Sequence, residues 1–163
     1  MGKGFEEKKV YLPQLLMSAE AAKSAFECIK TALLNSDTKM ESKCPVVIAT
    51  VKGDIHDIGK NIVKVLLESY GFSVIDLGRD VDPEAVCEGV LKNDCKLVGL
   101  SALMTTTVPA MEETIKQLHA MNIGVTVAVG GAVLTQEYSD MIKADFYSPD
   151  AMDTVRFAEK YYS

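Results

Sequence analysis

His56 is the residue of this chain best placed to do chemistry, because it stands between two carboxylates in a glycine-bounded loop. The sequence GDIHDIGK occupies residues 53–60, so Asp54 and Asp57 flank the imidazole. A neutral imidazole can ligate a metal ion, and a neighbouring aspartate can accept its second N–H, which fixes the tautomer and raises the basicity of the ligating nitrogen. The same segment also fits a loop histidine that is capped by local hydrogen bonds.

The elements around this loop predict an α/β domain. Apolar segments alternate with helical patterns from Pro45 onward. Strands are predicted at 46–51, 73–77, 97–101, 125–129 and, with a weaker pattern, near 145–147, and helices at 60–70, 83–92, 108–121, 135–142 and 150–162. Continuous apolar strands joined by helices indicate right-handed crossovers and a parallel sheet covered on both faces. Five strands make this a small doubly wound domain.

Polar or glycine-rich segments follow the first four predicted strands. Ligands of open α/β sheets bind beyond the carboxyl ends of the strands, so these loops are expected to converge on one site. Besides residues 53–60 they comprise 77–82, the hydroxyl-rich 101–107, and Gly130-Gly131. Taken alone, the glycine pair also fits a tight turn. The hydroxyls of Ser101 and Thr105–Thr107 also fit caps of the helix that follows.

The composition excludes several classes of function. The 163 residues carry a net charge of -6, and no Lys/Arg cluster supplies the basic face that nucleic-acid phosphates require. No apolar run approaches the roughly 20 residues of a membrane span, and the N-terminus has no apolar signal core. The four cysteines form no Cys-x-x-Cys pair. We therefore expect a cytoplasmic protein that binds neither nucleic acid nor membrane.

Two domains of unequal size are expected. Residues 11–34 show the spacing of an amphipathic helix, and the polar residues that follow lack periodicity. We therefore assign 1–43 to an N-terminal helical segment with its linker and 44–163 to the main domain. A lone apolar stripe costs free energy in water, so we expect self-association through this helix or a partner that covers it.

Three of the segments together resemble the cobalamin-binding signature of corrinoid-dependent methyltransferases. They are Asp54-x-His56-x-x-Gly59, Ser101-x-Leu103 and Gly130-Gly131, in this order and each at the end of a predicted strand. Residues 48–63 are similar to the corresponding stretch of cobalamin-dependent methionine synthase and of the corrinoid proteins of methanol and methylamine systems. The resemblance covers nearly all of 45–162 and implies a flavodoxin-like, Rossmann-type cobalamin-binding domain. Residues 10–14 resemble the end of the helical cap module that precedes it.

The resemblance also implies site residues. His56 would bind the cobalt of cobalamin or a related corrinoid from below, Asp54 would hydrogen-bond it, and Thr107, in place of a serine in methionine synthase, would extend this relay. Ser101 would contact the buried base of the cofactor. The expected cofactor-binding residues are Gly53, Asp54, Ile55, His56, Asp57, Ile58, Gly59, Ser101, Leu103, Thr105, Thr107, Gly130 and Gly131.

The implied function is that of a corrinoid protein. It would accept a methyl group from one methyltransferase subunit and deliver it to another, while the cobalt cycles between methyl-Co(III) and Co(I). A protonatable His–Asp–hydroxyl chain can couple proton uptake to release of the axial ligand. By itself the chain would be a carrier, because no segment resembles the barrel domains that bind homocysteine, methylamine, methanol or folate.

Three alternatives differ in class. Cobalamin subunits of adenosylcobalamin-dependent mutases share the signature but tend to carry Gly and Arg at the positions of Ile55 and Ile58. A cobalamin sensor would normally need an output module such as a DNA-binding domain, and none is recognised. A receiver domain needs a phosphorylatable aspartate after the third strand, where residues 101–107 contain no carboxylate.

Overall fold

A computed structural model of the chain describes residues 43–163 together with Met17, Ala21, Ser24, Ala25 and Cys28. The chain divides into two units, Met1–Lys39 and Met40–Ser163. The five described residues of the first unit are helical and fall within the helix expected at 11–34. The rest of that helix and most of its linker lie outside the described residues, and the predicted division at 43/44 stays a prediction.

The second unit alternates strands and helices. Its strands are β1 (Lys43–Thr50), β2 (Phe72–Asp76), β3 (Leu97–Ser101), β4 (Thr126–Gly130) and β5 (Phe146–Tyr147). Its helices are α3 (Ile58–Ser69), α4 (Pro83–Lys92), α5 (Val108–Ala120), α6 (Gln136–Met141) and α7 (Ala151–Tyr161), and a 3₁₀ turn η1 (Thr105–Thr107) precedes α5. Every strand and helix predicted for this unit is present, with small shifts at the ends. None of the described helices is long and apolar enough to span a membrane.

The five strands form one parallel sheet in the order β2-β1-β3-β4-β5. The order reverses between β1 and β3, so the loops that leave these two strands pass to opposite faces and open a crevice at their carboxyl ends. Thr50 and Ser101 are register partners at this point. The predicted fold class, a doubly wound five-stranded parallel sheet, is confirmed.

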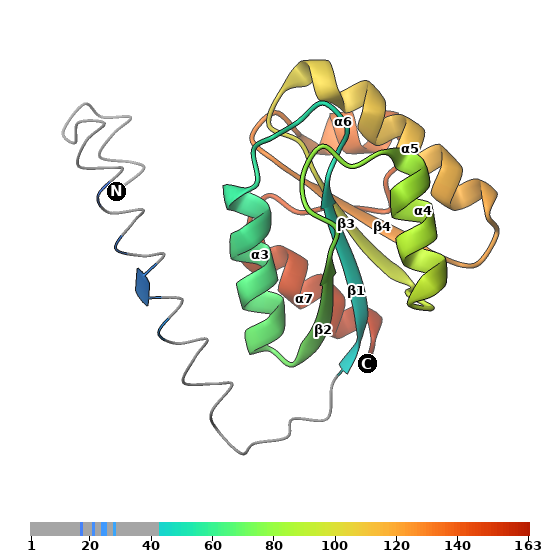
Figure 1. Cartoon of the computed structure of the whole chain (residues 1–163). Coiled ribbons are helices and arrows are strands. Elements are labelled where there is room, and N and C mark those ends of the chain that lie inside the picture. Colours follow the sequence, from blue (N-terminus) through green and yellow to red (C-terminus); the bar gives the residue numbers. More distant parts are fainter. Residues whose placement is uncertain (1–16, 18–20, 22–23, 26–27, 29–42) are drawn as a thin grey trace. The chain divides into compact units, whose positions relative to one another are not determined.

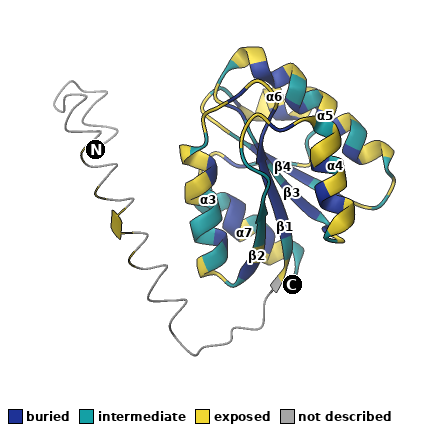
Figure 2. Ribbon diagram, in the orientation of Figure 1, coloured by how far each residue is buried: buried dark blue, intermediate teal, exposed yellow. Residues whose placement is uncertain are grey.

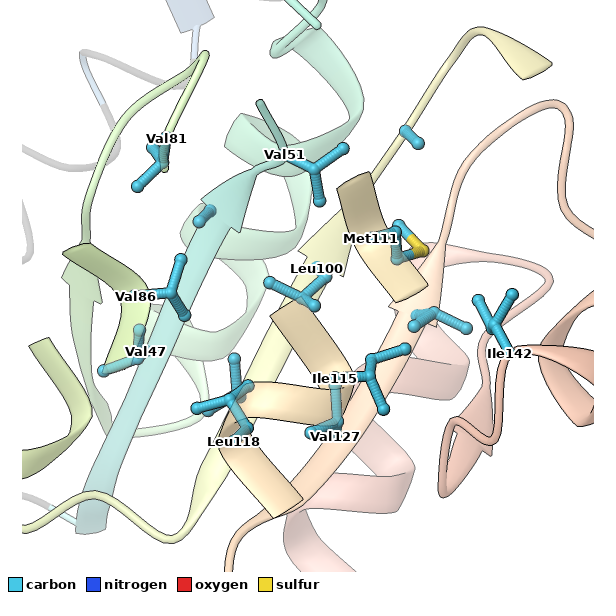
Figure 3. Packing of buried hydrophobic residues seen from close by; sticks show 14 of the residues in the cluster. Val47, Val51, Val81, Val86, Leu100, Met111, Ile115, Leu118, Val127 and Ile142 are labelled. Carbon is cyan, nitrogen blue, oxygen red and sulfur yellow. The ribbon is translucent and has the colours of Figure 1, made fainter. Parts of the chain in front are cut away.

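Helices cover both faces of the sheet, which explains its continuously apolar strands (Figures 1 and 2). On the face covered by α3 and α7, Ile48 of β1 belongs to a buried cluster with Leu67. On the face covered by α4 and α5, Val47 belongs to a second cluster with Val86 (Figure 3). Successive residues of β1 therefore point to opposite faces, as the two-residue period of a strand requires. This packing holds the end of β1 and its loop in place.

Candidate functional site

The loop between β1 and α3 holds the imidazole of His56 against Asp54. Oδ1 of the Asp54 carboxylate lies 2.8 Å from Nδ1 of the ring. A neutral ring that donates to this carboxylate carries its proton on Nδ1, so Nε2 keeps a lone pair. The His56 side chain is 46% exposed, whereas that of Asp54 is fully buried. The loop thus presents one nitrogen that can ligate a metal ion.

The other oxygen of Asp54 connects this loop to the segment after β3. Oδ2 accepts hydrogen bonds from the backbone N–H of Leu103 at 2.6 Å and of Met104 at 3.3 Å, and from the hydroxyl of Thr107 at 3.1 Å. Burial raises the pKa of Asp54, but hydrogen bonds from His56, Leu103 and Thr107 outweigh it and lower the pKa to about 2. Asp54 is therefore ionised at neutral pH and remains an acceptor for the Nδ1 proton.

Thr107 is part of this network and does not cap a helix. It occupies the N-cap position of α5, but its side chain makes no capping hydrogen bond. Its hydroxyl lies 3.1 Å from Oδ2 of Asp54 and 2.8 Å from the carbonyl oxygen of Met104. One hydroxyl proton can serve one of these acceptors at a time. The helix-cap interpretation of Thr107 is wrong, and the structure brings His56, Asp54 and Thr107 together.

A second polar contact joins the ends of β1 and β3. Oγ1 of Thr50 lies 3.0 Å from Oγ of Ser101, and it donates a long hydrogen bond of 3.4 Å to the carbonyl oxygen of His56. Thr50 is fully buried. Sequence reasoning missed Thr50 because a threonine in an apolar run reads as part of the strand. The available signal was its place near the end of the predicted strand, three residues before the loop.

A cavity of about 710 Å³ opens beside His56, between the carboxyl ends of the strands and the first turns of α3 and α7. Nine of the predicted cofactor-binding residues line it: Ile55, His56, Asp57, Ile58, Gly59, Ser101, Leu103, Gly130 and Gly131. The other four do not. Asp54 and Thr107 are buried in the hydrogen-bond network, Gly53 is exposed in the loop, and Thr105 is exposed at the start of η1.

The inner wall of the cavity is apolar and includes a strand that the sequence reasoning did not use. Ile48, Leu100 and Val129 contribute from β1, β3 and β4. Tyr147 and Ser148 contribute from the end of β5. Because the carboxyl ends of parallel strands meet at one edge, the loop after the weak fifth strand could have been included.

Two glycines of the predicted signature, Gly59 and Gly131, are explained by different features of the structure. Gly131 has φ +143°, and an added Cβ would lie 1.9 Å from the carbonyl oxygen of Ala102. This glycine is therefore required by the turn after β4, although it also lines the cavity. At Gly59, by contrast, nothing lies within 4 Å of an added Cβ. Gly59 borders open space in the cavity, where a side chain would take room from a ligand.

Apolar side chains stand exposed around the mouth of the cavity. Ile55 is 60% and Ile58 is 74% exposed, and Ile62 and Leu103 beside them are also exposed. Apolar side chains gathered in this way on a surface mark a place where a ligand or partner binds. A cavity of this size with a few polar groups is typical of a site for a small molecule or cofactor.

A family model described as the B12 binding domain matches residues 45–158. The chain belongs to this B12-binding family. It is 40% identical over 159 residues to dimethylamine corrinoid protein 1 of Methanosarcina acetivorans, covering 96% of this chain and 74% of that protein. Among solved structures, the monomethylamine corrinoid protein of Methanosarcina barkeri matches with a TM-score of 0.76 at 30% identity, over 98% of this chain and 76% of the other. The methanol:cobalamin methyltransferase complex of the same organism matches with a TM-score of 0.74 at 35% identity, over 98% and 61%.

The residues of this B12-binding domain fit a corrinoid. His56 presents an imidazole nitrogen of the kind that can ligate a metal ion, and its ring is oriented by Asp54. The exposed Ile55, Ile58 and Leu103 offer an apolar surface to a macrocycle, and the cavity beside them offers space to the rest of the molecule. Both a donor and a shaped apolar recess are therefore present on one edge of the sheet.

Proposed function

We propose that this chain is a methyl-carrying corrinoid protein, which receives a methyl group on cobalt from one methyltransferase and delivers it to another. The observation that carries the proposal is the network of His56, Asp54 and Thr107 at the cavity of a B12-binding domain. Relatives named as methylamine corrinoid proteins support it, as does the structural likeness to a methanol:cobalamin methyltransferase complex. The chain acts as a carrier together with substrate-specific and acceptor methyltransferases.

In the proposed complex the cobalt supplies the atom that carries the methyl group. His56 would hold it through Nε2, while Asp54 accepts a hydrogen bond from the Nδ1–H and strengthens the imidazole as a ligand. A proton on Nε2 removes the lone pair, so protonation at that atom and ligation exclude each other. Thr107 and the backbone N–H groups after β3 keep Asp54 ionised, whether Nε2 is protonated or free to ligate.

The other residues of the site hold the cofactor. Ile55, Ile58 and Leu103 would lie against the corrin, which would remove their apolar surfaces from water. The cavity would receive the nucleotide tail of the cofactor, and Ser101 would contact the base of that tail. The hydroxyl of Ser101 is positioned for this by Thr50 at 3.0 Å. Gly59 leaves room at the cavity wall.

Two further expectations belong to the proposal. We place the protein in the cytoplasm, in keeping with four cysteines that are all free. We also expect self-association or a partner at the N-terminal helix, of which only Met17, Ala21, Ser24, Ala25 and Cys28 are described.

The test is the visible spectrum of the protein after reconstitution with methylcobalamin and gel filtration, compared with that of His56→Gly. We expect a red, His-ligated spectrum for the parent and a yellow, base-off spectrum for the variant, with corrinoid retained by both. His119→Gly is the matched control, because the other histidine pairs with Asp145 and does not line the cavity. Identical spectra for parent and His56→Gly would exclude His56 as the ligand, and a parent without corrinoid would overturn the proposal.

The carrier role needs a second measurement. The reduced, corrinoid-loaded protein is mixed with a methyltransferase specific for a methylated amine and with that amine. Growth of the methylcobalamin spectrum is expected. A subunit of an adenosylcobalamin mutase would instead show no methylation under these conditions.

A further inference from the structure

The loop between β2 and α4 is bonded to the His56 loop through Asp80. Oδ1 of Asp80 accepts a hydrogen bond from the backbone N–H of Gly53 at 2.9 Å. The backbone N–H of Asp80 donates to the carbonyl oxygen of Asp54 at 3.0 Å. Asp80 therefore bonds to two consecutive residues, to Gly53 through its side chain and to Asp54 through its backbone N–H. The side chain of Asp54 is the carboxylate that orients His56.

The backbone of Asp80 is in an uncommon conformation. Its φ is +54°, in the left-handed region that residues other than glycine rarely adopt and that Asp and Asn tolerate best. Such a conformation persists where the surrounding structure holds it. Here the surroundings include the N–H of Thr50 bonded to the carbonyl oxygen of Gly78 at 3.0 Å and the N–H of Val81 bonded to the carbonyl oxygen of Thr50 at 3.1 Å. The segment 78–81 thus runs along the end of β1 and is hydrogen-bonded to it.

Asp80 acts on the loop and does not line the cavity. Its side chain is 48% exposed and lies 3.5 Å from Nζ of Lys52, which is itself 3.3 Å from Asp82. Ion pairs as exposed as these contribute little to stability. The hydrogen bond to the Gly53 N–H and the left-handed backbone are therefore the features through which Asp80 acts.

We propose that Asp80 is a positioning residue for His56. It holds Gly53 and Asp54 so that one carboxylate meets both the imidazole and the N–H groups after β3. The fraction of protein in which the imidazole is aimed at cobalt then depends on Asp80. This inference rests on the proposed function, because its main readout is ligation by His56.

Three substitutions separate the two properties of Asp80. Asp80→Asn keeps an oxygen acceptor and tolerates the left-handed backbone, Asp80→Gly keeps the backbone but loses the acceptor, and Asp80→Ala loses both. After reconstitution with methylcobalamin, we expect the ratio of His-ligated to base-off spectrum to stay at the parent value in Asp80→Asn. In Asp80→Gly it should fall roughly fivefold, the effect of one net hydrogen bond on an equilibrium. Asp80→Ala should fall further.

A second readout needs no cofactor. Hydrogen exchange of the Gly53 amide in the cofactor-free protein should accelerate in Asp80→Gly and not in Asp80→Asn. Asp94→Gly is the matched control, because Asp94 also has a positive φ, of +45°, and its exposed side chain lies outside the site. Lys52→Ala should leave both readouts at the parent value, because the ion pair is not the active feature.

Each outcome decides. Parent-like spectra and Gly53 exchange in Asp80→Gly would overturn the inference and leave the proposed function intact. Equal losses in Asp80→Asn and Asp80→Gly, or a loss in Lys52→Ala as large as that in Asp80→Gly, would also overturn it. If the parent retains no corrinoid or matches His56→Gly, the proposed function fails instead. The exchange of Gly53 then still shows whether Asp80 holds the loop.

Discussion

A single oxygen of Asp54 meets His56 twice. Oδ1 accepts the backbone N–H of His56 at 3.0 Å and lies 2.8 Å from Nδ1 of its ring. The conformation of the loop and the orientation of the imidazole are therefore fixed by the same atom. The other oxygen receives N–H and O–H groups from the segment after β3, so a change in either loop is felt by the other.

Replacing Asp54 by asparagine should destabilise the cofactor-free protein. An amide has one oxygen and one NH₂ group, so either His56 or the N–H groups of Leu103 and Met104 must face a donor. We expect the free energy of unfolding to fall by roughly 1–3 kcal/mol, the cost of buried donors left unpaired. Urea denaturation measures it. Asp94→Asn, at an exposed position, is the control and should change stability by no more than about 0.5 kcal/mol.

The stability of the parent protein and that of Asp54→Asn should depend differently on pH. The pKa of Asp54 is about 2 in the folded protein, against an ordinary value of 3.8. A lowered pKa of a carboxyl group stabilises the folded state fully above pH 3.8, and this stabilisation is lost as the pH falls toward 2. The difference in urea midpoint between parent and Asp54→Asn should therefore shrink between about pH 4 and pH 2. A difference that stays constant over this range would show that the charge of Asp54 adds nothing.

Much of the fold could be predicted because its causes are local in the sequence. The alternation of apolar strands and helical periods indicates a parallel sheet, and strands of such a sheet end at one edge. Pro83 and Pro109 mark the first turns of α4 and α5. The short β5 was the weakest pattern, since two residues give no periodicity.

The site could be predicted only in part. Asp54 and His56 belong to a recognisable signature, as does Ser101. However, Asp54 is held by backbone N–H groups after β3, and Ser101 contacts Thr50, which the signature does not include. The hydrogen bond from the backbone N–H of Leu103 to Asp54 could not be predicted from the sequence, because every residue except proline carries a backbone N–H. Asp80 reads as one of several charges in a polar loop, and its proposed role depends on how the segment after β2 lies along the end of β1.

Alanine at Gly131 and alanine at Gly59 should change the free energy of unfolding in opposite directions. At Gly131 the added methyl would meet the carbonyl oxygen of Ala102 at 1.9 Å, and φ is +143°. We expect Gly131→Ala to lower the free energy of unfolding by more than about 2 kcal/mol, because backbone must move. At Gly59 nothing lies within 4 Å, and in a helix alanine is favoured over glycine by up to about 1 kcal/mol.

Corrinoid binding should separate these two variants further. Gly59→Ala should be at least as stable as the parent yet retain less methylcobalamin after gel filtration, because the methyl stands at the cavity wall. Thermal unfolding of the cofactor-free proteins gives the first quantity, and absorbance of the retained corrinoid gives the second. Retention equal to the parent would show that Gly59 does not border the bound cofactor.

The two lysines that share Asp76 should contribute unequally to stability. Lys60 reaches Oδ1 with its side chain 3% exposed, whereas Lys64 lies 3.2 Å from Oδ2 with its side chain 27% exposed. Burial raises the pKa of Asp76, but the hydrogen bond from Lys60 and that from the Gly78 N–H outweigh it and lower the pKa. Removing Lys60 leaves a half-buried carboxylate with its more exposed partner.

We therefore expect Lys60→Met to cost about 2–3 kcal/mol, less than a buried charge left alone because Lys64 remains. Lys64→Met, the same substitution at the more exposed lysine, should cost less than about 1 kcal/mol. Urea denaturation at neutral pH compares them. Equal losses would mean that the burial of Lys60 adds nothing to the pair. The lowered pKa of Asp76 stabilises the fold at pH values above its ordinary pKa of 3.8. The difference in free energy of unfolding between Lys60→Met and the parent should therefore narrow as the pH falls below 3.8.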